Sequence, residues 1–342
     1  MLNLRIELDS KVAVYKQLVN AITDAVKNGT LAGGDIVPSM NALSEELNIS
    51  KETVKHAYGE LTKRGILEAH QGKGFFVSDN VDKSTVSVLF LMDKFSVYKQ
   101  EIVRGFHQEI ASRTEDTILL FNQDVHVFEY FLNENLGKYD YYIVAPHFSL
   151  APAVQAKVKK LLKRIPNRML IMIDRWVSDI PGNYGAVYQD FENDVYDGLS
   201  QGLDRFEGRN ELKVITLPTS LYGPVMERKV RQFCKENGLK VRFLNDAPAE
   251  IEKGDVFLIL NSQLDSGLIA LVDNANAKGM KVGSDYFIIS YNDSPIDKVV
   301  LNGLTTISTD FNLMGREAAR MVNEKSMWKT HIDFRMNKRN TF

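Results

Sequence analysis

The pattern of apolar positions at the start of the chain predicts three short helices. In the first, which Gly29 would end, five apolar residues recur at helical spacing: Leu18, Val19, Ile22, Ala25 and Val26. Ser39 is a suitable N-cap for a second helix that runs through Leu47. Ser50 can cap a third helix that ends near Arg64, where a glycine follows.

The third helix has two distinct faces. One face carries an apolar stripe for packing, formed by Val54, Ala57, Tyr58 and Leu61. The other face is polar, with Lys51, Glu52 and Thr53 at its N-terminal end and Lys55 and His56 after them. The connection from the second helix is short, which holds the two helices at a steep angle. This arrangement is typical of a helix-turn-helix, whose second helix enters the DNA major groove by its N-terminal end.

The next apolar runs predict a hairpin. Ile66 and Leu67 precede the tip Gln71-Gly72-Lys73-Gly74, and the run 75–77 follows it. The glycines let the tip approach a phosphate backbone closely, and Lys73 places a positive charge there. A small helical bundle with a surface hairpin and no nucleic acid is the alternative interpretation.

After the polar stretch 79–85, apolar strands alternate with helical patterns. The strand segments are VSVLFLM, TILLF, YYIVA, MLIMID, KVITL, KVRFL, VFLIL and MKVGS (280–284). Continuous apolar strands between helices predict parallel sheets that are covered on both faces. This part is too long for one open sheet, so two βα lobes with a cleft between them are expected. We predict a DNA-binding domain over 1–78, a linker over 79–85 and an effector-binding domain over 86–342.

Polar side chains follow several of these strands. Ligands of α/β sheets bind beyond the carboxyl ends of the strands, so these side chains are candidate effector contacts. Charged and amide groups that bond hydroxyl pairs, beside an aromatic ring, suit a sugar. Taken singly, each could instead cap a loop. The set is Tyr98, Lys99, Asp174, Arg175, Trp176, Asp190, Asn261, Asn292 and Asp293.

Composition narrows the function classes. The chain has 342 residues, 44% hydrophobic and 25% charged, with a net charge of −2. Residues 1–78 include nine Lys or Arg and nine Asp or Glu, so this part has no net charge. A positively charged DNA-binding face must therefore come from the local arrangement of the basic residues. The single cysteine, Cys234, fits a reducing compartment, and neither a signal peptide nor a membrane span is evident. We therefore expect a cytoplasmic protein.

Motifs of catalysis are missing from the sequence. It has no G-x-G-x-x-G after a strand, no Walker P-loop, no H-E-x-x-H and no G-x-S-x-G. The six histidines are scattered without metal-ligand spacing. We expect no enzyme activity, no cofactor and no metal.

The front of the chain resembles the winged helix-turn-helix of GntR-type bacterial regulators. The shared motifs are G-D-x-V-P-S, L-S-x-E-L-x-I-S-x-x-T-V, A-Y-x-x-L and G-x-G-F-F-V. Two positions that are usually Arg in that family are Asn41 and Lys51 here, which implies DNA binding with a different operator sequence. The expected DNA contacts are Ser39, Asn41, Ser50, Lys51, Glu52, Thr53, Lys55, His56 and Lys73.

The rest of the chain, from about Val86 to Val322, resembles the sensor domain of LacI/GalR-type repressors. The resemblance rests on three segments: EIVRGF, IDR followed by VYQDFENDVYDGL, and NGLTTISTDFNLMGREAARMV. It implies a type I, two-lobed periplasmic-binding-protein-like fold. The implied ligand contacts are Tyr98 or Lys99, Arg175, Asp190, Asn261 and Asn292, with Asn292 in place of the usual Asp. The family's R-x-x-G-F position falls on Lys229, with Arg228 and Arg231 beside it.

The combination of a GntR-type DNA-binding domain with a LacI-like sensor domain resembles the bacterial arabinose repressors. The likeness implies a homodimer that binds operator DNA and is released by a monosaccharide such as a pentose or 6-deoxyhexose (arabinose, fucose). Three alternatives stay open. The effector could be a purine or amino acid, the second half could be aminotransferase-like with pyridoxal phosphate, or the chain could be a sugar-transport binding protein.

Overall fold

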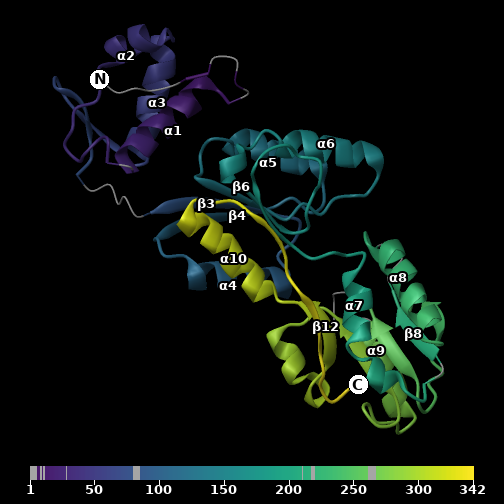
Figure 1. The fold of residues 1–342 in the computed structure, drawn as a ribbon. Coiled ribbons are helices and arrows are strands. Elements are labelled where there is room, and N and C mark those ends of the chain that lie inside the picture. Colours follow the sequence, from purple (N-terminus) through teal and green to yellow (C-terminus); the bar gives the residue numbers. More distant parts are fainter. Residues whose placement is uncertain are drawn as a thin grey trace.

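The computed structural model describes residues 6–7, 10, 12–27, 29–79, 85–209, 211–216, 220–260 and 267–342. Within these ranges the strands form one two-stranded sheet and two six-stranded sheets. Figure 1 shows the three parts in sequence, with the small N-terminal domain at one end and the C-terminus in the last lobe. None of the helices in these ranges is both long enough and apolar enough to cross a bilayer.

The N-terminal domain is a three-helix unit with a hairpin, as the sequence predicts. Its elements are α1 (Val14–Lys27), α2 (Met40–Leu47), α3 (Lys51–Lys63), β1 (Leu67–His70) and β2 (Gly74–Val77). Both predicted N-caps are confirmed: Ser39 accepts from the Ala42 amide at 3.2 Å, and Ser50 accepts from the Thr53 amide at 3.1 Å. The apolar stripe of α3 is fully buried against α1 and the hairpin.

The first lobe is built on a parallel sheet in the order β13-β7-β6-β5-β3-β4. Helices α4 and α10 cover one face and α5 and α6 cover the other. The strands are β3 (Val86–Met92), β4 (Thr114–Leu120), β5 (Tyr141–Val144), β6 (Leu170–Asp174), β7 (Gly185–Tyr188) and β13 (Lys329–His331). The helices are α4 (Val97–Glu109), α5 (Val125–Asn135), α6 (Pro152–Leu162) and α10 (Phe311–Glu324).

The second lobe has the sheet order β14-β12-β11-β10-β8-β9, parallel except for the antiparallel edge strand β14. Helices α7 and α8 pack on one face and α9 on the other. The strands are β8 (Glu211–Ile215), β9 (Lys240–Leu244), β10 (Val256–Ile259), β11 (Phe287–Tyr291), β12 (Thr305–Thr309) and β14 (Phe334–Asn337). The helices are α7 (Asp194–Ser200), α8 (Gly223–Glu236) and α9 (Gly267–Ala277).

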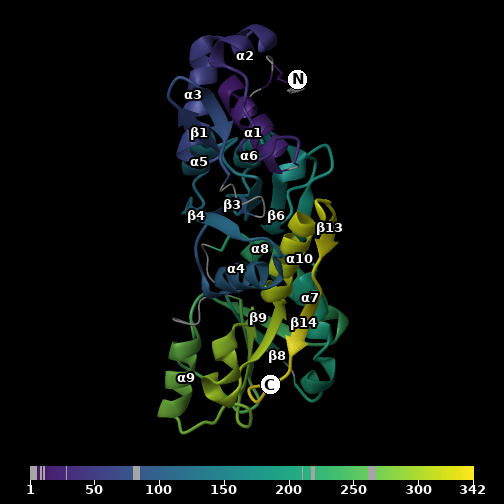
Figure 2. The same ribbon diagram turned by 90° about the vertical axis from the view of Figure 1, so that its left-hand side faces the viewer.

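The chain crosses between the lobes three times, after β7, after β12 and after β13. Figure 2 shows the last of these segments running down the side of the molecule from β13 to β14. Because α10 follows a strand of the second lobe yet packs on the first, the lobes are tied by several short segments rather than by one linker. Such connections act as a hinge between two rigid bodies.

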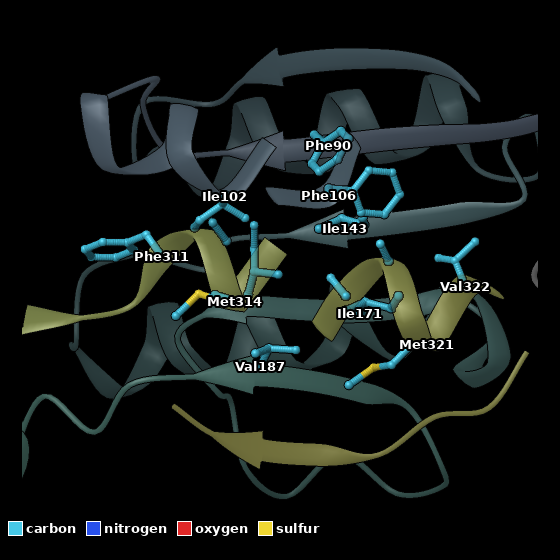
Figure 3. Packing of buried hydrophobic residues seen from close by; sticks show 14 of the residues in the cluster. Phe90, Ile102, Phe106, Ile143, Ile171, Val187, Phe311, Met314, Met321 and Val322 are labelled. Carbon is cyan, nitrogen blue, oxygen red and sulfur yellow. The ribbon is translucent and has the colours of Figure 1, made fainter. Parts of the chain in front are cut away.

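Helices α4 and α10 approach each other unusually closely. A Cβ on Gly105 would lie 2.0 Å from the Asn312 carbonyl oxygen, and one on Gly315 would lie 1.9 Å from the Ile102 carbonyl oxygen. Phe106, Met314 and the strand residue Ile171 belong to the same hydrophobic core, which Figure 3 shows. The two glycines therefore fix the distance between the helices of the first lobe.

Two sequence predictions need comment. The strand expected at 280–284 is wrong: this segment turns, and only Val282 makes an isolated bridge, with Tyr286. The strand lies at Phe287–Tyr291 instead, because that run offers five consecutive residues that can be buried between helices. Of the expected linker 79–85, residues 80–84 lie outside the described ranges.

Candidate functional site

A cavity of about 390 Å³ lies between the two lobes. The first lobe contributes polar residues that follow its strands, and the second contributes mainly aromatic and aliphatic side chains. The lining residues are Asp93, Lys94, Ser96, Tyr98, Lys99, Gln123, His147, Asp174, Gln189, Phe191, Ser220, Leu221, Tyr222, Met226, Leu260, Tyr291, Asn292 and Phe311. The cavity therefore sits at the carboxyl ends of the parallel strands, where α/β folds bind ligands.

A buried polar network centres on Asp174, the last residue of β6. Its carboxylate lies 2.8 Å from His147 Nε2 and 3.5 Å from Lys99 Nζ, and it accepts from Gln189 Nε2 at 2.6 Å. Lys99 also pairs with Asp93, and the two carboxylates, the lysine and the imidazole are all at most 6% exposed. Burial of charge on this scale is tolerated because each group has a charged or hydrogen-bonding partner.

The environment keeps Asp174 ionised. Burial acts to raise the pKa of this carboxyl, but the charges of His147 and Lys99 and the hydrogen bonds from His147 and Gln189 lower the pKa below its usual range. The backbone of Asp174 is strained as well, with φ at 69° and the Arg175 amide donating to the Ile173 carbonyl at 2.7 Å. Strain held at a buried charged residue is a common mark of a functional site.

The network continues across the cleft to the second lobe. His147 Nδ1 lies 2.8 Å from the Tyr222 hydroxyl, and the Tyr291 hydroxyl donates to Gln189 Oε1 at 3.1 Å. Burial raises the pKa of both tyrosines above the usual value, so both remain protonated and able to donate. Gln189 lies in the first crossing segment, so a polar chain runs from Asp174 through the hinge to the second lobe.

Aromatic rings form the apolar part of the cavity. Phe191 and Tyr222 are stacked with ring centroids 3.9 Å apart at 15°, and Tyr98 and Phe311 lie 5.3 Å apart. Rings beside hydrogen-bonding groups suit a ligand that has both C–H faces and hydroxyls.

Asn292 leaves one hydrogen-bonding atom of the cavity without a partner. The side chain is 7% exposed, and its Oδ1 has no hydrogen-bond partner among the described residues. A buried acceptor left unpaired costs about 1–3 kcal/mol, which a ligand donor would relieve. Its φ of 71° suits Asn, one of the few residues that adopt the left-handed region readily.

Four of the predicted effector residues, Tyr98, Lys99, Asp174 and Asn292, do meet in this cavity. Arg175 does not line it: its guanidinium donates to the Pro146 carbonyl at 2.9 Å and to Gln155 Oε1 at 2.9 Å. The guanidinium also lies 5.8 Å from the Tyr222 ring centroid, so Arg175 reaches the cleft beside a lining residue of the second lobe without being part of the lining itself.

Other predicted residues also have roles outside the cavity. Trp176 is half-exposed and donates to the Tyr184 hydroxyl at 3.0 Å. Asp190 accepts from the Glu192 and Asn193 amides at 3.0 and 3.3 Å, so it stabilises the turn that precedes α7. Neither is among the lining residues, and both have the structural roles that polar side chains at strand ends often have.

The remaining predicted residues fall into three cases. Lys229 on α8 lies outside the lining, as do Arg228, which pairs with Glu192, and Arg231, which stacks on a phenylalanine ring. Asp293 lines a different cavity, of about 580 Å³, and pairs with Arg339 at 2.6 Å. Asn261 lies outside the described residues.

Sequence reasoning missed several lining residues. Asp93 and His147 follow the strand runs VSVLFLM and YYIVA, so the rule that pointed to Asp174 would have found both. Tyr222 and Phe191 follow no comparable signal, because their positions depend on how the second lobe faces the first.

The N-terminal domain presents an exposed polar face. Lys51, Glu52 and Lys55 are exposed on α3, with Lys55 paired to Glu52 at 3.1 Å, and Asn41 is exposed on α2. The hydroxyls of Ser39 and Ser50 accept the capping hydrogen bonds of α2 and α3. The His56 ring stacks on the Tyr15 ring of α1, with the ring centroids 4.0 Å apart. The first lysines of α3 are thus the better placed of the expected DNA contacts.

The hairpin tip has the geometry that the sequence predicts. Gly72 and Gly74 have φ values of 75° and 103°, which favour glycine, and Lys73 between them is exposed. The same domain touches the first lobe through α1, where Lys16 Nζ donates to the Asn133 carbonyl at 3.3 Å. A lobe movement can therefore reach the N-terminal domain through direct contact.

Two family models match separate parts of the chain. Residues 14–77 match the bacterial regulatory proteins of the gntR family, and residues 207–331 match the periplasmic binding protein-like domain. The first match covers the three helices and the hairpin, and the second covers most of the second lobe.

Curated relatives align with the front of the chain. The HTH-type transcriptional repressor YtrA of Bacillus subtilis is 29% identical over 91 residues, which are 27% of this chain and 70% of that protein. The arabinose metabolism transcriptional repressor of Geobacillus stearothermophilus is 28% identical over 104 residues, which are 29% of this chain and 28% of that protein. The chain thus spans less than a third of the latter's length in this alignment.

Solved structures resemble the rest of the chain. The lactose repressor bound to the anti-inducer ONPF has a TM-score of 0.57 at 14% identity, covering 74% of this chain and 99% of that one. A LacI family regulator from Lactobacillus casei with bound glucose has a TM-score of 0.55 at 17% identity, and the alignment covers 75% of this chain and 100% of that one. At this identity the likeness establishes the fold. The chain therefore joins an N-terminal domain that matches the gntR family model to a two-lobed domain with a periplasmic-binding-protein-like fold.

Proposed function

We propose that this chain is a transcriptional repressor whose affinity for operator DNA is lowered by a monosaccharide bound between the two lobes. It has the two domains of a transcription regulator, one for DNA and one for a small molecule. Several relatives that match its N-terminal domain, including YtrA and the arabinose metabolism repressor, are transcriptional repressors by name. In this proposal it acts in the cytoplasm as a homodimer on paired operator half-sites.

The observation that carries the proposal is the composition of the interlobe cavity. Charged and amide groups lie at one side, stacked rings lie at the other, and Asn292 offers a buried acceptor that has no partner among the described residues. A sugar presents hydroxyls that pair with the polar groups and C–H faces that pack on the rings. A pentose or hexose, such as arabinose or fucose, fits this chemistry better than an aliphatic ligand does.

The network supplies a mechanism for the response. His147 and Gln189 bond to tyrosines of the second lobe, so hydroxyls inserted beside Asp174 change how the lobes are held together. Because three segments connect the lobes, a change in cleft geometry becomes a rotation of one lobe against the other. In a dimer this rotation alters the spacing of the two winged helices, and DNA affinity changes with it.

A screen of small metabolites tests the proposal. The full chain is mixed with monosaccharides, purines and amino acids, and thermal unfolding is recorded for each mixture, since a ligand that binds the folded state raises the midpoint. We expect only the sugars to raise the unfolding midpoint, and titration calorimetry then measures the affinity for the sugar that binds. Stabilisation by a purine or an amino acid with no response to any sugar would contradict the proposed effector class.

Replacing Asn292 with Gly is expected to weaken sugar binding about three- to tenfold, because one buried hydrogen bond is lost while the left-handed backbone stays accessible. Asn302→Gly is the matched control, since Asn302 also has a positive φ, of 59°, and lies outside the cavity lining. Titration calorimetry with the identified sugar measures the affinity of both variants and of the parent. Equal affinities in Asn292→Gly and the parent would remove Asn292 from the site.

Replacing Lys73 with Ala is expected to weaken binding to operator and to random DNA alike. A lysine at an exposed hairpin tip contacts phosphates, so the slope of log affinity against log salt should fall by about one per subunit. Lys240→Ala, an exposed lysine on β9 of the second lobe, should change neither quantity. A gel-shift titration at several salt concentrations would contradict the contact if both variants behaved like the parent.

A further inference from the structure

We propose that two residues at the hinge, His331 and Asp194, hold the lobes in the arrangement that forms the interlobe cavity. His331 is thereby a positioning residue for the effector, although it lies outside the cavity lining. The effect on sugar affinity rests on the proposed function, whereas the effect on the lobes can be measured without any sugar. The two residues are called the hinge pair below.

The hinge pair joins the two lobes directly. His331 is the last residue of β13, which pairs with β7 in the sheet of the first lobe. Asp194 is the first residue of α7, which packs on the sheet of the second lobe. His331 Nε2 lies 2.8 Å from Asp194 Oδ1, so a side chain of one lobe bonds a side chain of the other beside the crossing segments.

Asp194 depends on this contact because it is almost completely buried. The residue is 1% exposed, and its second oxygen, Oδ2, accepts from the Asp190 backbone amide at 2.6 Å. Asp190 belongs to the first crossing segment, so the carboxylate ties that segment to β13. A buried carboxylate that loses a partner keeps an uncompensated charge, and the lobe arrangement that preserves both contacts is favoured.

The first crossing segment also reaches the cavity. Gln189, the residue before Asp190, lines the cavity and bonds Asp174 of the first lobe and Tyr291 of the second. The segment therefore has polar contacts with the cavity at one end and with the hinge pair at the other. A rotation of the second lobe that opens the cavity also moves α7 away from β13 and stretches the hinge pair.

The consequence for the effector follows from populations. The cavity combines groups of both lobes, so a sugar binds only the molecules in which the lobes are held as the structure shows. The apparent affinity is the intrinsic affinity multiplied by the fraction of such molecules. Loss of the hinge pair lowers that fraction without changing any residue that the sugar touches.

His331 is the member of the pair to replace. Its side chain is 37% exposed and faces the second cavity, so a shorter side chain leaves no void in a hydrophobic core. His331→Ala removes the contact, whereas His331→Gln keeps a side-chain N–H that can donate to Asp194.

A buried ion pair within one lobe supplies the matched control. Lys213 on β8 and Asp255 before β10 lie 2.6 Å apart, with side chains 10% and 12% exposed, and both belong to the second lobe. Asp255→Ala breaks a buried charge pair that does not join the lobes. Thermal unfolding of each variant shows how much stability the two changes remove.

The first measurement follows the lobes without sugar. Spin labels are attached to the full chain through Tyr130→Cys on α5 and Ile269→Cys on α9, two exposed positions in different lobes. The natural Cys234 is buried, which raises the pKa of its thiol to about 11 and protects it from labelling. Pulsed electron resonance should give a wider distance distribution in His331→Ala than in the parent, and the parental distribution in His331→Gln and Asp255→Ala.

The second measurement is titration calorimetry with arabinose, fucose and glucose. For the sugar that binds the parent, we expect about tenfold weaker binding by His331→Ala, as when only about a tenth of the molecules keep the competent arrangement. His331→Gln and Asp255→Ala should bind that sugar like the parent. If His331→Ala does not fold, His331→Leu takes its place, because leucine fills the space without a donor.

An unchanged distance distribution in His331→Ala would overturn this inference and leave the proposed function standing. An equal widening in Asp255→Ala would overturn it too, since general destabilisation would then explain the effect. Wider distances in His331→Ala with no sugar bound by the parent would support the hinge pair and contradict the proposed effector class.

Discussion

Replacing Asp174 with Ala is expected to lower the free energy of unfolding by about 3–5 kcal/mol and to abolish sugar binding. The change leaves the Lys99 ammonium with one carboxylate partner and removes the hydrogen bonds that His147 and Gln189 make to Asp174. All these groups are buried, so water cannot replace the lost partner without opening the cleft. The loss therefore affects both the first lobe and the contacts across the cleft.

Denaturant unfolding of the full chain, followed by calorimetry with the identified sugar, measures both effects. Glu250→Ala is the control, because that carboxylate is exposed and pairs with Lys278 at the surface, where ion pairs contribute little. A loss below about 1 kcal/mol in Asp174→Ala, with sugar affinity intact, would show that the network is not essential to the site.

The pH dependence of this stabilisation has a definite sign. Because the folded protein holds the pKa of Asp174 below its unfolded value of about 3.9, the contribution is present above that pH and lost as pH falls below it. The stability difference between the parent and Asp174→Ala should thus shrink on acidification below about pH 4.

Replacing Gly315 with Ala is expected to destabilise the first lobe by about 1–3 kcal/mol, since a Cβ there would lie 1.9 Å from a backbone oxygen of α4. The obstacle is backbone rather than a flexible side chain, so the helices must separate. Gly59→Ala in α3 is the matched control: a Cβ there meets no atom within 4 Å, and alanine should stabilise that helix by up to about 1 kcal/mol.

Thermal and denaturant unfolding of these two glycine variants give the comparison directly. Because α10 packs on the first lobe but follows a strand of the second, Gly315→Ala should also alter sugar affinity through the hinge. Equal stability of Gly315→Ala and the parent would mean that α4 and α10 do not approach as closely as the structure shows.

Local patterns predicted most of the fold. The caps at Ser39 and Ser50 and the strand Val86–Met92 appear where the sequence places them, because each depends on neighbouring residues alone. The prediction of a strand at 280–284 failed because this run has only two apolar residues, whereas four of the five residues of the strand Phe287–Tyr291 are buried.

The site was harder to predict than the fold. The rule that ligands bind at strand ends pointed to Asp174 and Asn292, and both line the cavity. The same rule could not tell which neighbours enter the lining, so it also included Arg175, which lies beside Tyr222 at the edge of the cavity, and Asp190, which bonds the turn before α7. Tyr222 comes from the opposite lobe, and no local pattern reports how two lobes face each other.

The central claim is that a sugar in the interlobe cleft lowers the affinity of the winged helix for DNA. An operator is first selected from random DNA by repeated binding to the full chain, and its affinity is then measured by fluorescence anisotropy with and without the identified sugar. We predict that saturating sugar weakens operator binding at least tenfold, and that Asn292→Gly needs more sugar for the same release while binding operator normally without it. Unchanged operator affinity at a sugar concentration that saturates the cleft would contradict the account.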